Sequence, residues 1–170
     1  FASMMGKKDK LIKLDCRSLE YEYIPFKLEG MKVLLLNTNV KHSLASSEYN
    51  LRRSDCETAA SWIHAHHPEV TSLRNATEAM LDTYVLPKSE MVDRRSRYVV
   101  QEITRLLSAC EALKHDDIQT LGKLMYATHD GLSNAYNVSC KELDWLVAAV
   151  KNNNAVAGAR MMGGGFGGCT

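Results

Sequence analysis

Alternation of apolar and polar residues near the start of the chain predicts two β-strands joined by a tight turn. Apolar side chains recur at about every second position in residues 11–16 and 19–24, as in strands with one buried face. Arg17 and Ser18 form the connection between them. Residues 31–36 follow as a largely apolar run, which favours a third strand covered on both faces.

The pattern then changes to a helical period. A long helix is predicted from an N-cap at Ser43 to a stop before Pro68, and a second helix over about residues 88–114. The apolar positions that predict the buried faces of these two helices are Leu44, Leu51, Ala59, Ala60 and Ile63, and Val92, Val99, Ile103, Leu106 and Leu107.

Two further helices and a short strand complete the pattern. Asp116 or Asp117 caps a helix with Ile118, Leu121, Leu124 and Met125 inward, and Ser139-Cys-Lys-Glu142 reads as a capping box. The box opens a helix through Leu143, Leu146, Val147 and Val150, and residues 156–161 predict a strand. Strands, then a helical layer, then a strand indicate an α+β fold.

Composition narrows the class of protein. The 170 residues are 45% apolar and 24% charged, which is ordinary for one soluble globular domain. A net charge of +1 gives no reason to expect nucleic acid or an anionic membrane as partner. No apolar run approaches the roughly 18 residues of a membrane-spanning helix. The five cysteines are widely spaced without a Cys-x-x-Cys pair, which favours reduced thiols in a cytoplasmic protein.

The last twelve residues before Thr170 hold six of the ten glycines. Such a run is explained by backbone angles that only glycine adopts easily, or by close approach of the main chain to a bulky or charged group. It has neither the Lys-Ser/Thr of a P-loop nor a Gly-x-Gly-x-x-Gly that opens a helix. Composition leaves two interpretations open, a loop whose N–H groups cradle an anion and a flexible tail.

Three other groups of polar residues have structural explanations. His64, His66 and His67 precede Pro68 and fit a solvated helix end better than a metal site. Asp116 and Asp117 are helix caps rather than an acid–base pair. The arginines Arg52, Arg53, Arg94, Arg95 and Arg97 are interpreted as a solvated helix face rather than an anion site.

Polar residues crowd positions 37–49, where a buried strand is predicted to give way to a helix. Ligands often bind at such strand ends in proteins that contain both strands and helices. Tyr49 offers an apolar ring with a hydroxyl group, which suits a sugar. It could equally be a boundary residue of the core, and the pattern leaves both roles open.

This segment carries a resemblance to a known family. Residues 39–50, the following Arg52-Arg53 and Cys56-Glu57 closely resemble the same stretch of galactokinases. The resemblance continues through residues 1–6 and 14–20 and through residues 124–144. The glycine run is similar to the third motif of the galactokinase, homoserine kinase, mevalonate kinase and phosphomevalonate kinase superfamily.

The resemblance implies how the chain is organised. Residues 1–29 would be the end of an N-terminal kinase domain, and residues 30–170 a ferredoxin-like C-terminal domain that is incomplete at its C-terminus. We therefore expect a piece of a longer polypeptide. The family's catalytic aspartate would lie two residues before Phe1, so we expect no catalytic residue and no metal ligand in this chain.

The resemblance also implies an activity. The intact protein would transfer the γ-phosphoryl group of ATP, with Mg²⁺, to the anomeric hydroxyl of galactose. It would be a cytoplasmic monomer with galactose and ATP as its partners. A kinase-like sugar sensor that contacts a transcriptional regulator remains an alternative, as does an N-acetylgalactosamine kinase.

Several residues take roles from the resemblance. Tyr49 would contact galactose, and Lys41 would lie near the transferred phosphoryl group. The loop that borders the phosphate site would consist of Gly163, Gly164, Gly165, Phe166, Gly167 and Gly168. Met162 departs from the family, which usually has a small hydroxyl residue there, and Tyr98 stands where relatives often carry histidine.

Overall fold

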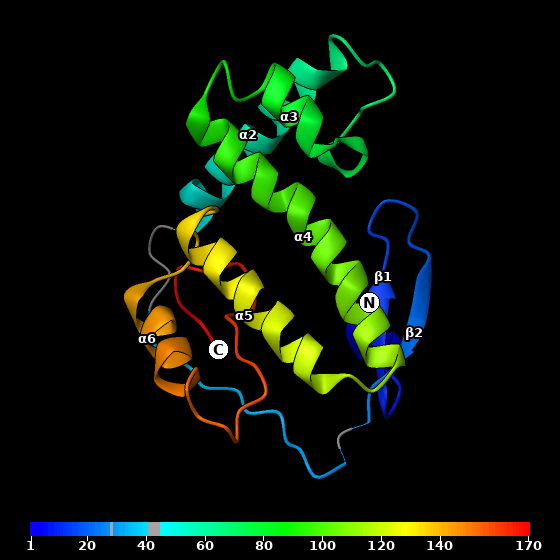
Figure 1. Cartoon of the computed structure of the whole chain (residues 1–170), viewed down its shortest axis with the longest axis vertical. Coiled ribbons are helices and arrows are strands. Elements are labelled where there is room, and N and C mark those ends of the chain that lie inside the picture. The colour runs from blue at the N-terminus through cyan, green and yellow to red at the C-terminus, as the bar shows by residue number, and fades with distance from the viewer. Residues whose placement is uncertain (28, 41–44) are drawn as a thin grey trace.

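The structure of the chain, a computed structural model, is a helical body with a small β-hairpin at one side (Figure 1). It describes residues 1–27, 29–40 and 45–170, and for residues 45–47 the backbone alone. Helices and a two-stranded sheet together confirm the predicted α+β class. The chain opens with a single helical turn, α1 (Ala2–Met5).

The predicted hairpin is present. Strands β1 (Lys10–Leu14) and β2 (Tyr21–Pro25) pair antiparallel, and the turn between them is longer at both ends than the sequence predicts. Leu19 closes this turn by donating its N–H to the carbonyl of Asp15 at 2.8 Å. Ile24 of β2 is fully buried against the C-terminal half of the longest helix (Figure 1), and the ion pair of Glu22 with Lys114 at 3.2 Å joins the hairpin to the same helix.

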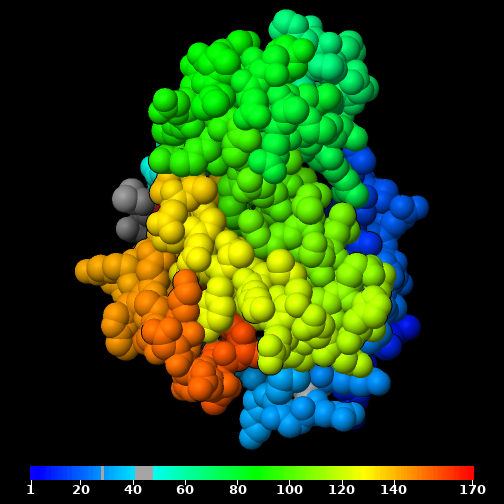
Figure 2. All heavy atoms as spheres, viewed as in Figure 1, coloured from blue at the N-terminus to red at the C-terminus, as the bar shows by residue number. Residues whose placement is uncertain are grey.

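The predicted strand at residues 31–36 is wrong. This segment has no regular structure, and Leu34 is 73% exposed. Within residues 1–27, 29–40 and 45–170, only the end of this segment has a backbone partner: the Leu36 N–H and carbonyl both bond to Thr170, at 2.9 and 3.0 Å. A strand needs a neighbour along its length, and the light-blue segment instead lies at the lower edge of the molecule (Figure 2). The predicted strand at residues 156–161 is likewise irregular.

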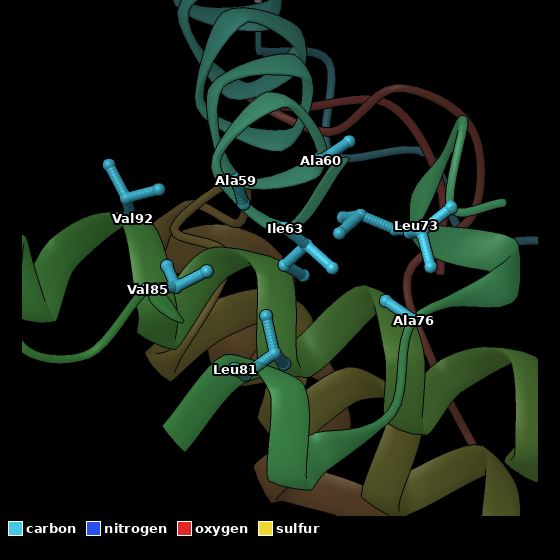
Figure 3. Close-up of a cluster of buried hydrophobic side chains, with 9 residues drawn as sticks. Ala59, Ala60, Ile63, Leu73, Ala76, Leu81, Val85 and Val92 are labelled. Carbon is cyan, nitrogen blue, oxygen red and sulfur yellow. The ribbon is translucent and has the colours of Figure 1, made fainter. Parts of the chain in front are cut away.

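Four helical elements enclose the largest apolar cluster (Figure 3). They are α2 (Ala45–His64), the 3₁₀ helix η1 (Leu73–Asn75), α3 (Glu78–Tyr84) and α4 (Glu90–Lys114). The cluster consists of Ala59, Ala60, Ile63, Val70, Leu73, Ala76, Leu81, Val85 and Val92. The sequence pattern did not predict η1 or α3, because each is too short to show a helical period.

The buried face of α4 differs from the predicted one in its C-terminal half. Leu106 and Leu107 are about half exposed, whereas Cys110 and Leu113 are buried against Ile24 of the hairpin. The helical period alone could not say from which side β2 would approach. Ser89 caps α4 by accepting the N–H of Val92.

The two predicted caps of the last helices have different outcomes. Asp117 caps α5 (Ile118–Asn134) by accepting the N–H of Thr120 at 2.9 Å, as predicted. The capping box before α6 (Lys141–Val150) is wrong, because the N-cap residue is Cys140. The Ser139 hydroxyl donates instead to the carboxylate of Asp144 at 2.6 Å.

Two backbones lie in direct contact where α5 crosses the segment before the glycine run. A Cβ on Gly122 would overlap the carbonyl of Ala157, and a Cβ on Gly158 would lie 2.5 Å from the Cα of Gly122. Neither position has room for any side chain, so the two glycines set how closely this segment lies on α5.

We predict that Gly122→Ala destabilises the chain. The methyl group would meet main chain, which cannot rotate away, and overpacking of this kind costs about 1–3 kcal/mol. Urea unfolding of the two proteins measures the difference.

Gly164→Ala is the matched control, because a Cβ at Gly164 meets nothing within 4 Å. Its midpoint should stay close to that of the parent chain. Equal urea midpoints for Gly122→Ala and Gly164→Ala would show that α5 and the segment at Gly158 are not packed as closely as described.

Candidate functional site

Tyr49 lies in the first turns of α2 with 54% of its surface exposed. It is therefore available to a ligand and is not a core residue. Lys41, the predicted neighbour of the transferred phosphoryl group, and the predicted N-cap Ser43 lie outside the described residues.

Arg52 lies one turn further along α2 and is buried, not on a solvated face as the sequence predicted. It is 5% exposed. Its Nε donates to the carbonyl of Tyr136 and its Nη2 to the carbonyl of Asn137, both at 2.8 Å. Its Nη1 lies 2.9 Å from the Glu48 carboxylate. A buried charge is tolerated when it is paired and hydrogen-bonded, and all these contacts meet that need.

Arg95 and Arg97 are further corrections to the predicted solvated face. Arg95 pairs with Asp55 of α2, and both side chains are mostly buried. Arg97 joins carboxylates of α3 and α4, including Asp93 at 2.8 Å. Arg53 and Arg94 fit the prediction, because both are exposed, and Arg53 pairs with Glu57 at 2.7 Å.

The turn between α5 and α6 receives the guanidinium of Arg52. Asn137 has a φ of 55°, in the left-handed region that asparagine tolerates better than most residues. The ring of Tyr136 packs at 5.3 Å from that of Tyr98, and burial raises the pKa of the Tyr136 hydroxyl. Tyr98, where relatives often carry histidine, is buried against Gly131, which has no space for a side chain.

The glycine run forms a loop whose two ends, Met162 and Cys169, are hydrogen-bonded to each other. Gly163, Gly165, Gly167 and Gly168 all have positive φ, which explains the choice of glycine there. Phe166 also has a positive φ, of 60°.

Two features anchor this loop to the α5–α6 turn. The Phe166 N–H donates to the carbonyl of Val138 at 2.6 Å. A Cβ on Gly165 would overlap the same carbonyl. At the base of the loop the Met162 N–H donates to the carbonyl of Cys169 at 3.0 Å. The hydrogen bonds favour a structured loop over a tail.

Part of the loop is open. A Cβ on Gly163 or Gly164 would meet nothing within 4 Å. Within the described part of the chain, these two residues and Gly165 donate no backbone hydrogen bond. Free N–H groups in a turn with positive φ suit an anionic oxygen. Met162, which departs from the family, has an exposed side chain, and nothing in the structure explains its substitution.

His129 and Asp144 hold the segment that leads into the loop. The N–H of Met161 donates to Nδ1 of His129 at 3.2 Å, so the ring proton sits on Nε2, which lies 3.2 Å from the Asp144 carboxylate. Ser133 and Ser139 donate to the same carboxylate. Burial lowers the pKa of His129, although Asp144 opposes the shift.

The remaining candidates are structural. His64 contacts the carbonyl of Val70 at 3.1 Å, and His67 lies near Glu69 and Tyr84. His66 stacks on Tyr84. The described residues contain no group of three or more His, Cys, Asp or Glu side chains that could hold a metal ion. In the same ranges, no helix has the length and apolar character to cross a membrane.

Comparison with known proteins gives the class first. Residues 102–170, which include α5, α6 and the glycine loop, match a protein family described as "GHMP kinases C terminal". The similarity to this family therefore covers the C-terminal part of the chain, from the middle of α4 to Thr170.

More specific similarity extends over nearly the whole chain. A galactokinase of Thermotoga maritima is 43% identical over 168 residues, 99% of this chain and 45% of the relative. A galactokinase of Fusobacterium nucleatum is 41% identical over the whole chain and 44% of its own length. The chain is thus similar to galactokinases throughout, and it spans about 45% of the length of these relatives.

The fold agrees with this similarity. The crystal structure of Lactococcus lactis galactokinase complexed with galactose superposes with a TM-score of 0.88 at 33% sequence identity. The match covers 96% of this chain and 42% of that one.

We predict that acidification lowers the free energy of unfolding of the chain, partly through His129. A histidine whose pKa is lowered on folding stabilises the folded state above its unfolded pKa of about 6.5, and this stability is lost as pH falls through the folded pKa. Protonation of Nδ1 would also remove the acceptor of the Met161 N–H.

Urea unfolding of the parent chain and of His129→Gln at pH 8 and at several values below 6.5 measures this effect. The variant should be less stable than the parent at pH 8 and lose less stability on acidification. An equally steep loss in both proteins would contradict the assignment.

Proposed function

We propose that the whole protein containing this chain is a galactokinase that transfers the γ-phosphoryl group of ATP to the anomeric hydroxyl of galactose. The observation that carries the proposal is similarity to galactokinases over 99% of the chain, at 43% identity. The link between Tyr49 on α2 and the glycine loop, through Arg52 and the α5–α6 turn, supports it.

Residue roles follow from this proposal. The exposed ring and hydroxyl of Tyr49 would contact galactose. Lys41 would lie near the phosphoryl group in transfer. Residues 163–168 would border the ATP phosphates, where the open N–H groups of Gly163 and Gly164 can donate to phosphate oxygens. We assign residues 1–29 to the end of an N-terminal kinase domain and residues 30–170 to a C-terminal kinase domain.

Catalysis would rest on positioning and on stabilisation of charge. The transferred phosphoryl group passes through a loose transition state with charge spread over its oxygens, so fixed main-chain donors lower the barrier without moving. Magnesium would arrive with ATP, and we assign none of the described residues to it. The same proposal makes the protein a cytoplasmic monomer, in keeping with its use of ATP and the absence of any disulfide among the described residues.

We predict that the purified whole protein forms galactose 1-phosphate from galactose and ATP. Because the chain spans 45% of the relatives' length and carries no assigned base, the 170 residues alone should show no turnover. Coupled detection of ADP, with mass analysis of the sugar product, measures both.

Other outcomes of this assay separate the alternatives. Faster turnover of N-acetylgalactosamine than of galactose would identify an N-acetylgalactosamine kinase. Binding of galactose and ATP without ADP formation would identify a sugar sensor. Either result would reject the proposed activity.

We predict that Tyr49→Ala in the whole protein raises the KM for galactose about tenfold, the equivalent of about 1.4 kcal/mol of lost binding. The KM for ATP should change far less, because the glycine loop is untouched. Steady-state kinetics with each substrate varied in turn measures both constants.

Leu106→Ala serves as the control, since Leu106 is about as exposed as Tyr49 but lies on α4 and has no contact with the candidate site among the described residues. Its KM values should match those of the parent. An unchanged KM for galactose in Tyr49→Ala would remove Tyr49 from the site.

A further inference from the structure

Arg52 connects two separate parts of the candidate site, whereas Arg53, the other arginine of α2, does not. Three of its nitrogens are engaged, two by the carbonyls of Tyr136 and Asn137 and one by the carboxylate of Glu48. Both carbonyls belong to the turn after α5, which is more than eighty residues away in the sequence. Arg52 therefore joins α2 to that turn directly.

The same turn holds the glycine loop. Val138, the residue after Asn137, accepts the N–H of Phe166 at 2.6 Å. The guanidinium carbon of Arg52 also lies 6.0 Å from the centre of the Phe166 ring, within the range of a cation–π contact. Arg52 thus reaches the loop by two routes, through the turn and through the aromatic ring.

Tyr49 lies at the other end of this connection. Residues three apart on a helix are neighbours on its surface, so Tyr49 and Arg52 move together as parts of α2. Tyr49 is also close enough to Tyr136 to add to the rise in the pKa of that hydroxyl. The helix that carries the candidate sugar residue and the candidate phosphate loop are therefore both joined to residues 136–138.

Lysine could not replace this arrangement. The guanidinium is planar and presents five N–H donors in a fixed fork, whereas the lysine ammonium is a single point on a flexible stem. One ammonium cannot reach the two carbonyls and Glu48 in the same geometry. The second arginine, Arg53, contacts only Glu57 of its own helix among the described residues and joins no two elements.

We propose that Arg52 is a positioning residue that sets the distance between the sugar at Tyr49 and the phosphates at the glycine loop. The inference rests on the proposed kinase function and adds a requirement to it. Phosphoryl transfer needs the attacking hydroxyl and the γ-phosphate in line, so the two half-sites must be fixed relative to each other. Arg52 contributes to the turnover step without touching either substrate.

The test is the steady-state kinetics of Arg52→Lys in the whole protein. A misplacement of about 1 Å costs up to about 100-fold in rate, so kcat should fall at least about tenfold. Each KM should change by less than about threefold, because both half-sites still bind their own ligand. Rates are expressed per folded molecule, with circular dichroism and thermal unfolding on the same samples.

Arg53→Lys is the matched control, one residue away on the same helix and exposed. Its kcat and KM values should stay within about twofold of the parent, as is usual for surface substitutions. If Arg52→Lys does not fold, Glu48→Gln provides the test instead. This variant keeps the Arg52 guanidinium and weakens only its ion pair with residue 48. Glu48→Gln should lower kcat by a smaller factor than the tenfold expected for Arg52→Lys, and an unchanged kcat would reject positioning by Arg52.

Each outcome has one reading. A parent protein without galactose-dependent ADP formation rejects the proposed function itself. An active parent whose folded Arg52→Lys has the parent's kcat rejects positioning by Arg52 and leaves the function intact. A loss of activity that follows only the loss of folded protein, with an unchanged kcat per folded molecule, also rejects it.

Discussion

The buried guanidinium of Arg52 connects α2 to the turn between α5 and α6, and the arrangement of the candidate site depends on that connection. Because burial removes water from around its positive charge, the guanidinium needs hydrogen-bond acceptors inside the protein. The acceptors are main-chain carbonyls of residues 136 and 137 and the carboxylate of Glu48. Because carbonyls cannot change rotamer, the arginine fixes where the backbone of the turn lies.

The glycine loop is built on the same turn by a different kind of constraint. Positive φ angles at Gly163, Gly165, Gly167 and Gly168 give the chain its curvature, and the Val138 carbonyl fixes its depth. His129 and Asp144 support the approach to the loop through the N–H of Met161. Main-chain hydrogen bonds, together with packing of Phe166 on the buried Val138, Leu143 and Met161, therefore shape the part of the site proposed to meet phosphate, while its outer edge stays open.

Local signals in the sequence predicted local structure well. The hairpin, the two long helices and the Asp117 cap are all present, because alternation, period and capping depend on neighbouring residues. The predictions that failed depended on distant partners. Residues 31–36 read as a buried strand, but among the described residues only Leu36 of this segment pairs with another part of the backbone, and Ser139 binds Asp144 in place of the backbone of α6. The pattern on α4 likewise misplaced Leu106 and Leu107, since it could not locate β2.

The sequence by itself determined the α+β class, the kinase family resemblance and the candidates Tyr49 and residues 163–168. It could not distinguish Arg52 from Arg53, two adjacent arginines on one predicted helix. Only the tertiary structure decided that Arg52 is buried and bridges two elements while Arg53 stays exposed. The physical reason is that burial is a property of what packs against a side chain. For Arg52 that partner is a turn more than eighty residues away, which no local pattern records.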